Sequence, residues 1–366
     1  HFQEVTVKKI DWYIFKKLIT TFVYVVVLLV LIICVIDFTE KNDNYMKNQV
    51  PAKLILQYYL TFFPYFAILL TPITTFIATV LVTAKMASQT EIIAILSSGI
   101  SFRRMMYPYF YSAVLIGAFS FVFIGYIIPN ANKFRINFEL EYLEKPYYFS
   151  DRNIHFKIGA TDYIYIDRYN NQRDIGYNVT LERIEGQELK EKITAKRIQW
   201  DTTTHKWSLI SWQKRTILPD KEIITEAEND ASLDTTLVLS PSDFQNKERL
   251  WETLTLPELN AHIERQQLRG ADDVQVYLIE KYIRFMQPFT VIILCFIALI
   301  VSARKSRRGT GFQIALGFLI AFVFVILFIL TRAIAEAGTM NPILAVWLPN
   351  IIFSMVGILL YNTVPR

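Results

Sequence analysis

Charged residues and cysteine are scarce in this chain. Only 19% of its 366 residues are Asp, Glu, Lys or Arg, while 53% are hydrophobic. That composition excludes a disordered chain and an ordinary soluble globule, because so much apolar surface needs surroundings other than water. The two cysteines, Cys34 and Cys295, lie inside apolar runs, so no disulfide framework is predicted. The four histidines are scattered singly, and we predict no metal site.

The motifs of catalysis are also missing from the sequence. There is no G-x-x-x-x-G-K-[ST] phosphate loop, so the chain should not hydrolyse ATP itself. Its long apolar runs contain no ionisable Asp, Glu, Lys, Arg or His, which argues against a proton-coupled transporter and an intramembrane protease. We therefore predict that the protein is not an enzyme and uses no cofactor. Any energy for transport must come from a partner.

Six apolar runs are long enough to cross a bilayer as helices. They are residues 18–36, 62–82, 105–128, 285–301, 312–330 and 342–360. The first run is too long for a signal peptide and is predicted to stay as an anchor. The sequence thus predicts an N-terminal block of three spans over 1–128 and a C-terminal block of three spans over 285–366.

The formal net charge of +5 is interpreted as a topology signal, and no nucleic-acid partner is predicted. Most Lys and Arg in the short flanks of the runs fall on one side of the membrane: Lys8, Lys9, Lys16, Lys17, Lys85, Arg103, Arg104, Arg304, Lys305, Arg307, Arg308 and Arg366. The other side has Lys41, Lys47, Lys53 and Arg332. The positive-inside rule then predicts that both termini are cytoplasmic and that the long segment between the two blocks is external.

The external segment has the pattern of an all-β domain, predicted over 129–254. Runs such as 163–169, 192–198 and 207–212 alternate with a period of two and are rich in aromatic and β-branched residues. Polar turns separate them at 170–172, 185–186, 202–205 and 219–220, a spacing typical of a sandwich, jellyroll or barrel. A capping box, Thr255-x-x-Glu258, predicts a helical connector over 255–284.

A short helix is predicted over 88–99, between the second and third spans. Ser88 would be its N-cap, Glu91 its N3 residue and Gly99 its end. Its apolar residues recur at helical spacing and could lie on the membrane surface or enter a groove on a cytoplasmic partner. These residues are Ile92, Ile95, Leu96 and Gly99. Glu91 has two interpretations, a capping carboxylate or an acidic contact to a partner.

Several short motifs follow one another along nearly the whole chain. They are Asp11-x-Tyr13, Ser88-x-x-Glu91 with Ser97-Ser98-Gly99-Ile100-Ser101, Tyr163-Ile164-Tyr165-Ile166-Asp167, Gln287-Pro288 and Asn341-Pro342-x-x-Ala345-x-Trp347-x-Pro349. In this order they resemble the LptF/LptG permease family, the membrane subunits of the lipopolysaccharide exporter of Gram-negative bacteria. The Asp11-x-Tyr13 opening slightly favours LptG.

The resemblance implies a permease of the bacterial inner membrane that exports lipopolysaccharide. Its partners would be a cytoplasmic ABC ATPase dimer, a second permease of the same type and an LptC-like bitopic subunit that feeds a periplasmic bridge. The external domain would be a β-jellyroll whose apolar groove receives acyl chains. Helix 88–99 would be the coupling helix, and Glu91 would lie where the family places an acidic residue that meets the ATPase.

The resemblance also directs attention to the substrate path. The family meets lipid A phosphates with basic residues near the outer end of span one, where this chain offers Lys41 and Lys47 among Cys34, Asp37 and Glu40. Both lysines are equally well interpreted as surface residues. Gly317 and Ala321 in span five either form a lateral gate of the substrate cavity or serve packing within the chain. Ile164 and Ile166 are candidates for the β-groove, with the inward face undecided.

We therefore predict a six-span permease subunit that extracts lipopolysaccharide under ATP hydrolysis by a separate subunit. The alternative is a membrane-anchored scaffold or sensor whose external β domain binds a partner protein.

Overall fold

The structure is a computed structural model that describes residues 2–143, 152–227, 232–237, 239–244, 249–269, 274–303 and 310–362. It consists of two compact units. The helical unit comprises His1–Glu144, Trp251–Ala261 and Gln275–Arg366, and the β unit comprises Lys145–Leu250 and His262–Val274. The predicted class, a helical membrane protein with an inserted all-β domain, is confirmed.

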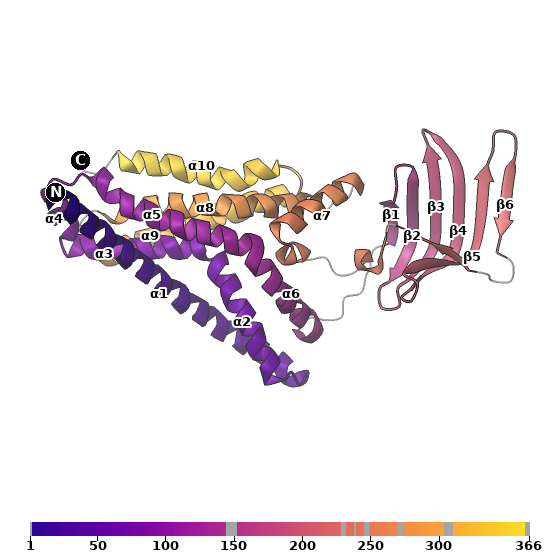
Figure 1. Ribbon diagram of the computed structural model, residues 1–366, viewed down its shortest axis with the longest axis horizontal. Helices are drawn as coiled ribbons and strands as arrows, with labels where there is room; N and C mark the ends of the chain where they lie inside the picture. Colours follow the sequence, from indigo (N-terminus) through magenta and orange to yellow (C-terminus); the bar gives the residue numbers. More distant parts are fainter. Residues whose placement is uncertain are drawn as a thin grey trace. The chain divides into compact units, whose positions relative to one another are not determined.

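The helices are named as in Figure 1. They are α1 (Phe2–Lys47), α2 (Ala52–Leu69), α3 (Thr71–Ser88), α4 (Glu91–Ser97), α5 (Phe102–Val122), α6 (Ile128–Phe138), α7 (Leu256–Arg269), α8 (Val274–Ser302), α9 (Thr310–Glu336) and α10 (Pro342–Tyr361). Two π-helical turns, η1 (Phe123–Ile127) and η2 (Glu139–Leu143), flank α6. Six of the described helical segments are long and apolar enough to cross a membrane, and α3 with α4 forms a further candidate bent by 71°.

The second predicted run, 62–82, does not form one straight helix. It covers the end of α2 and the start of α3, with a break at Leu70. Pro72 has no N–H to give to the carbonyl of Ile68, which would be its helical partner. The side-chain amide of Gln287 on α8 donates to that carbonyl instead, at 2.8 Å. The same amide donates to the Ser120 hydroxyl of α5 at 3.0 Å, so one side chain joins three helices.

The third predicted run extends further than its apolar residues. From α5 the chain stays helical through η1, α6 and η2 to Leu143, and these residues belong to the helical unit. The predicted start of the β domain at 129 is therefore corrected, since the first strand begins at Arg152. Pro129 does not end the helix because it lies in the first turn of α6, where its missing N–H is not needed. The predicted end of the domain also moves, because Trp251–Ala261 lies in the helical unit.

Helix α3 is the most buried span, and hydroxyl groups line it. Thr71, Thr74, Thr75, Thr79 and Thr83 are all buried, and four of them donate to carbonyls of the preceding turn. This satisfies the hydroxyls without water. Thr79 also contacts the Cys295 sulfur of α8, and Thr83 donates to the Tyr109 hydroxyl of α5 at 3.1 Å. Small polar residues thus bring α3 close to two neighbours.

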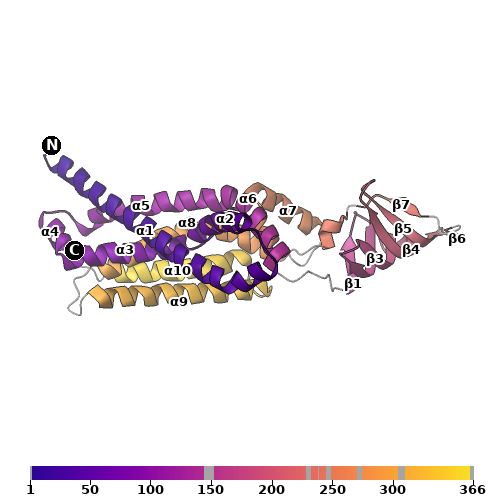
Figure 2. The same cartoon turned by 90° about the horizontal axis from the view of Figure 1, so that it is seen from below.

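The β unit is one antiparallel sheet. Its strands are β1 (Arg152–Lys157), β2 (Asp162–Asn170), β3 (Ile175–Glu185), β4 (Glu188–Asp201), β5 (Lys206–Ile217), β6 (Glu222–Glu226) and β7 (Leu233–Thr235). β1 to β6 pair in sequence order, and β7 returns to pair with β5 (Figures 1 and 2). The four predicted turns lie between these strands and are confirmed. A jellyroll connects strands across two sheets, whereas the described strands form a meander.

The connector begins as predicted. α7 starts at Leu256, directly after Thr255, and the Thr255 N–H donates to the Glu258 carboxylate at 2.8 Å. This hydrogen bond, with a second from the Thr255 hydroxyl, lowers the pKa of Glu258. Gly270, the predicted end of the helix, lies outside the described residues. α8 then runs through Lys281 and Arg284 into the fourth span, also as predicted.

Gly117 of α5 permits the closest approach between α5 and α8. A Cβ on Gly117 would lie 3.2 Å from the backbone of Pro288. We expect Gly117→Ala to destabilise the protein by about 1–3 kcal/mol, the usual cost of overpacking. Gly311→Ala is the matched control, since a Cβ there meets nothing within 4 Å. Thermal unfolding in detergent should show a lower midpoint for Gly117→Ala alone, and equal midpoints would contradict this packing.

Candidate functional site

Helix α4 occupies the position of the predicted coupling helix but is shorter than 88–99. Its first residue is Glu91, and its N-cap is Thr90 in a left-handed conformation with φ of 62°. The predicted N-cap Ser88 is wrong: Ser88 ends α3, and its hydroxyl donates to the Lys85 carbonyl. Gly99 does terminate the helical segment, with φ of +88°. Glu91 is thus the first helical residue, not the N3 residue of a capping box.

The apolar stripe of α4 packs onto the protein's own helices. Ile92 is buried, and Ile95 and Leu96 are half-buried against a core formed by α1, α3, α5 and α8. Ile92 is thus covered by the chain itself, because an amphipathic stripe does not say which apolar surface covers it, while a contact of Ile95, Leu96 and Gly99 with a partner stays a prediction. The exposed side of α4 holds Ile93, with half of its surface accessible, and Ser97, while Gly99 beyond its end is exposed too.

Glu91 is held by two residues of α1. Its carboxylate accepts hydrogen bonds from the Tyr13 hydroxyl at 3.2 Å and from the Lys17 ammonium at 3.3 Å. Lys17 also donates to the Tyr13 hydroxyl at 2.7 Å. About a quarter of the Glu91 side chain, 28%, stays accessible. The group therefore has a complete set of partners within the chain and is still open to approach from solvent.

A second ion pair joins α1 to α5 beside this cluster. The Arg104 guanidinium donates to both oxygens of Asp11, at 3.1 and 2.5 Å. The two residues of the Asp11-x-Tyr13 motif thus hold two different elements, Asp11 the start of α5 and Tyr13 the start of α4. Sequence reasoning treated Lys17 and Arg104 only as topology signals. Nothing local marks them as partners of residues more than seventy positions away.

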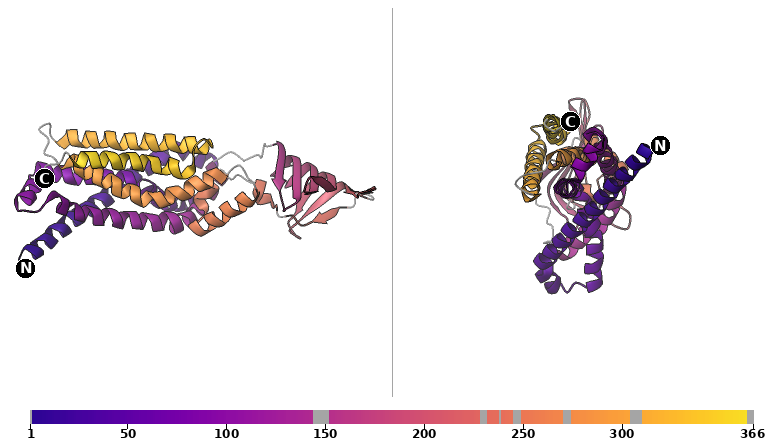
Figure 3. Two further views of the ribbon diagram at one scale, coloured as in Figure 1. Left: turned by 90° about the horizontal axis from the view of Figure 1, so that it is seen from above. Right: turned by 90° about the vertical axis from the view of Figure 1, so that its left-hand side faces the viewer.

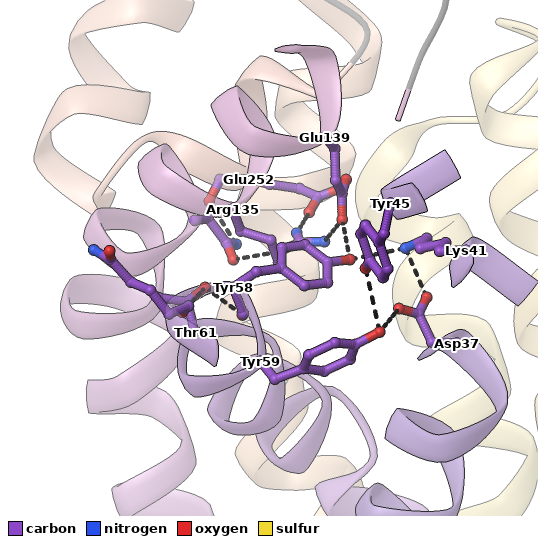
Figure 4. A network of polar contacts seen from close by, with 11 residues as sticks. Asp37, Lys41, Tyr45, Tyr58, Tyr59, Thr61, Arg135, Glu139 and Glu252 are labelled. Carbon is purple, nitrogen blue, oxygen red and sulfur yellow. Dashed lines mark hydrogen bonds and ion pairs between the residues drawn. The ribbon is translucent and has the colours of Figure 1, made fainter. Parts of the chain in front are cut away.

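A denser polar network lies at the opposite end of α1 (Figure 4). Lys41 forms an ion pair with Asp37 at 2.6 Å and donates to the Tyr58 hydroxyl at 2.8 Å. Tyr58 donates in turn to Glu139, at 2.7 Å. Arg135, only 2% exposed, pairs with Glu139 and with Glu252. α1, α2, α6, η2 and the segment before α7 are thereby joined.

This network changes the interpretation of the two lysines. The positive charge of Lys41 is balanced by Asp37, four residues earlier on α1, and its side chain is half-buried. The Lys41 ammonium is therefore already paired and is not a free cation for a phosphate group. Lys47 lies in the last turn of α1, is exposed and makes no ion pair within the part of the chain that the structure describes. Lys47 fits the interpretation as a surface residue, whereas Lys41 fits neither prediction and instead joins α1 to α2.

A cavity of about 490 Å³ opens beside this network within the helical unit. It lies between the α2–α3 break, α6, α8 and α9, and most of its lining is apolar. Polar groups concentrate in Asn132, Glu252, Glu280, Arg284, Gln287 and Arg332. Arg284 is buried and donates to the carbonyls of Leu254 at 2.7 Å and Trp251 at 2.6 Å. The cavity thus combines the apolar walls and polar end that an amphiphile requires.

Gly317 and Ala321 serve packing, not this cavity. A Cβ on Gly317 would lie 3.0 Å from Val80 of α3, and Ala321 is buried against the same helix pair. Neither residue lines the large cavity. The small side chains let α3 approach α9, which fits the packing interpretation, and their role in a lateral gate of the substrate cavity stays a prediction.

Ile164 and Ile166 share the inward face of the sheet. They are 1% and 2% exposed, and Ile166 stands in register with Ile154 and Val179 on the neighbouring strands. Leu239 and Phe244 cover this face, with Phe244 stacked on Tyr169 at 3.8 Å and the Trp207 indole donating to the Leu239 carbonyl at 2.8 Å. The two residues belong to a filled core here, and their role in a groove stays a prediction.

Comparison with known proteins settles the family. The family model for the lipopolysaccharide export system permease LptF/LptG matches residues 12–363. The chain belongs to the LptF/LptG family. No curated protein matches the chain. Family membership makes the protein a multi-pass membrane component of lipopolysaccharide export, a transport subunit and not a catalytic one. The family model describes LptF and LptG together.

In this LptF/LptG-type permease, the Lys17–Glu91 pair can be tested by exchanging its charges. Either Lys17→Glu or Glu91→Lys places like charges about 3.3 Å apart and should lower stability by roughly 1 kcal/mol, as for a partly exposed pair. The double exchange restores opposite charges and should recover most of the loss. Thermal unfolding in detergent measures the effect. A double variant as unstable as the sum of both single variants would rule out the tether.

Arg135 offers a second test in the same permease. Arg135→Met leaves Glu139 and Glu252 buried without their cation, which should cost about 3–5 kcal/mol. Arg332→Met is the matched control, because Arg332 pairs with Glu336 on an exposed helix turn and such pairs contribute only about 0.5 kcal/mol. The yield of folded, monodisperse protein should fall sharply for the first variant only. Similar behaviour of both would show that the buried network is dispensable.

Proposed function

We propose that this chain is one permease of an ABC exporter that extracts lipopolysaccharide from the inner membrane and passes it to a periplasmic bridge. The match of the LptF/LptG family over residues 12–363 carries the proposal. Its partners are a cytoplasmic ABC ATPase dimer, a second LptF/LptG-type permease and an LptC-like bitopic subunit. The chain has no phosphate-loop motif of its own, so a separate subunit hydrolyses ATP.

The orientation follows from charge and from the arrangement of the helical unit. The start of α1 and the end of α10 lie at the end of this unit that holds α4 (Figure 1). Lys and Arg are concentrated in the segments at that end, including Lys17, Lys85 and Arg103. The positive-inside rule makes it cytoplasmic. Both termini and α4 then face the ATPase, and the segment that contains the β unit is periplasmic.

Force from the ATPase reaches the substrate path through α1. The partner presses on the exposed side of α4, at Ile93 and Ser97, while Glu91 ties α4 to Tyr13 and Lys17. At roughly 70 Å, α1 is more than twice as long as the hydrocarbon core is thick. Its outer end is fixed to α2 and α6 by the network around Asp37, Lys41 and Tyr58. A displacement of α4 therefore moves the helices that border the large cavity.

The amphiphile follows a path from membrane to β unit in this proposal. The cavity beside α9 offers apolar walls to acyl chains, and its polar residues, among them Arg332 in its pair with Glu336, offer hydrogen bonds to a headgroup. The β unit offers an apolar inner face that includes Ile164 and Ile166. Acyl chains gain access to that face when Leu239 and Phe244 give way. Lys41 is paired with Asp37, whereas Lys47 forms no ion pair with any described residue. Of these two lysines, Lys47 is therefore the free cation at the outer end of α1.

The deciding experiment is affinity purification of the gently solubilised chain from its native membrane, followed by mass spectrometry. We expect an ABC ATPase, a second six-span permease and a lipid A glycolipid. Ile93→Glu should reduce ATPase recovery at least tenfold, since a charge replaces the exposed apolar contact of α4. Ile223→Glu is the matched control, because Ile223 in β6 is similarly exposed, 45% against 50%. Recovery of the chain alone, or with an unrelated external protein, would favour a scaffold or sensor.

A further inference from the structure

A groove between α5, α8 and α10 has no part in the roles described above. It has a volume of about 490 Å³, and its three helices lie side by side (Figures 1 and 3). Its walls are apolar, with Met106 from α5, Phe296, Ile297 and Ile300 from α8, and Phe353 and Ile358 from α10. At Gly357, α10 approaches α8 closely, since a Cβ there would lie 3.3 Å from Ile297. This close approach narrows one side of the groove.

Measured along its helices, the groove is slightly shorter than one membrane leaflet is thick. On α8 it extends from Ile293 to Ile300, and on α10 from Phe353 to Tyr361. At 1.5 Å per residue these stretches are roughly 10–12 Å long. Half of a hydrocarbon core is about 15 Å thick. A chain lying in the groove would therefore run along the helices from one membrane surface toward the middle of the bilayer.

Among the described residues that line the groove, Arg103 carries the positive charge at the surface end. Arg103 lines it there, in the first turn of α5, together with Tyr361 in the last turn of α10. The next residue, Arg104, is neutralised by Asp11, whereas Arg103 is exposed and forms no ion pair with any residue in the described part of the chain. α5 and α10 contain no Asp or Glu, and neither does α8 beyond Glu280.

We propose that this groove binds an anionic glycerophospholipid of the cytoplasmic leaflet. One acyl chain lies along the apolar walls, and the phosphate meets Arg103. The lining is mostly apolar, and its described cation, Arg103, lies at the open end, so the groove matches a lipid with apolar chains and a negatively charged headgroup. The site rests on the orientation proposed above, but not on the ATPase partner or on transport. It shares only α8 with the large cavity and lies at the other end of the helical unit.

The test uses native mass spectrometry of the full chain in detergent. The delipidated protein is mixed with equal amounts of phosphatidylglycerol and phosphatidylcholine that carry the same acyl chains. We expect one retained lipid with about fivefold preference for phosphatidylglycerol, which corresponds to the roughly 1 kcal/mol that one Lys or Arg contributes near an anionic surface. Arg103→Ala should abolish the preference, and Arg103→Lys should keep it. Lys85→Ala is the control, because Lys85 is an exposed cation at the same end, outside the groove.

Variants that fill the groove test the role of its apolar walls separately from the role of the Arg103 charge. Gly357→Phe should reduce retention of both lipids at least fivefold, and Ser354→Phe, also in the wall, provides a second obstruction if the first variant unfolds. Thermal unfolding confirms that each variant is folded. Unchanged retention in a folded obstructed variant would overturn the site, as would equal loss of preference in Lys85→Ala and Arg103→Ala. Loss of the ATPase without loss of the lipid would leave this site standing and contradict only the proposed exporter.

Discussion

A bilayer supplies no water to a buried carbonyl, and this constraint organises the helical unit. At the α2–α3 break, where Pro72 has no N–H for the carbonyl of Ile68, the Gln287 amide of α8 donates to that carbonyl and also to Ser120 of α5. α10 is joined to α8 in a similar way, because the Asn350 amide of α10 donates to the Thr290 hydroxyl of α8 at 2.8 Å. α8 is thus the central helix, because its polar side chains complete the hydrogen bonds of the helices around it.

The same constraint explains where the charges lie. Buried ions are stable only as complete sets, since an unpaired ion in a low-dielectric interior is strongly destabilising. Arg135 meets this requirement with Glu139, Glu252 and the face of Tyr65, 4.0 Å away. The partly exposed set around Glu91 is different, because solvent reaches it and an incoming cation can share the carboxylate. α1 connects the two sets, the buried one at the end near α2 and α6 and the partly exposed one at the end near α4.

Features that depend on composition and period were predictable from the sequence. Long apolar runs indicated the spans, and alternation with turn residues such as Glu185-Gly186 located the strands. The break at Leu70 was not visible, because both of its sides are apolar and only Pro72 marks it. The extension through α6 was missed because Pro129 and a polar stretch with Lys133 and Arg135 follow the apolar run, although Arg135 is buried. Partners far apart in sequence, such as Tyr13 and Glu91, leave no local signal. Asp37 and Lys41, four residues apart on one helix, do leave such a signal.

The core of the β unit is filled, so a lipid enters it only by displacing side chains that cover the inner face of the sheet. A single sheet buries its inner face only if something covers it, and here Leu239 and Phe244 do so. An acyl chain that replaced Phe244 against Tyr169 would restore the apolar contact to Tyr169 but would return the buried Phe244 side chain to water. The specific loss would be the hydrogen bond from Trp207 to the Leu239 carbonyl. A net hydrogen bond contributes about 1 kcal/mol, and burial of each large apolar side chain about 1.5–3 kcal/mol, so burial of Leu239 and Phe244 holds the covering segment more strongly than the hydrogen bond does.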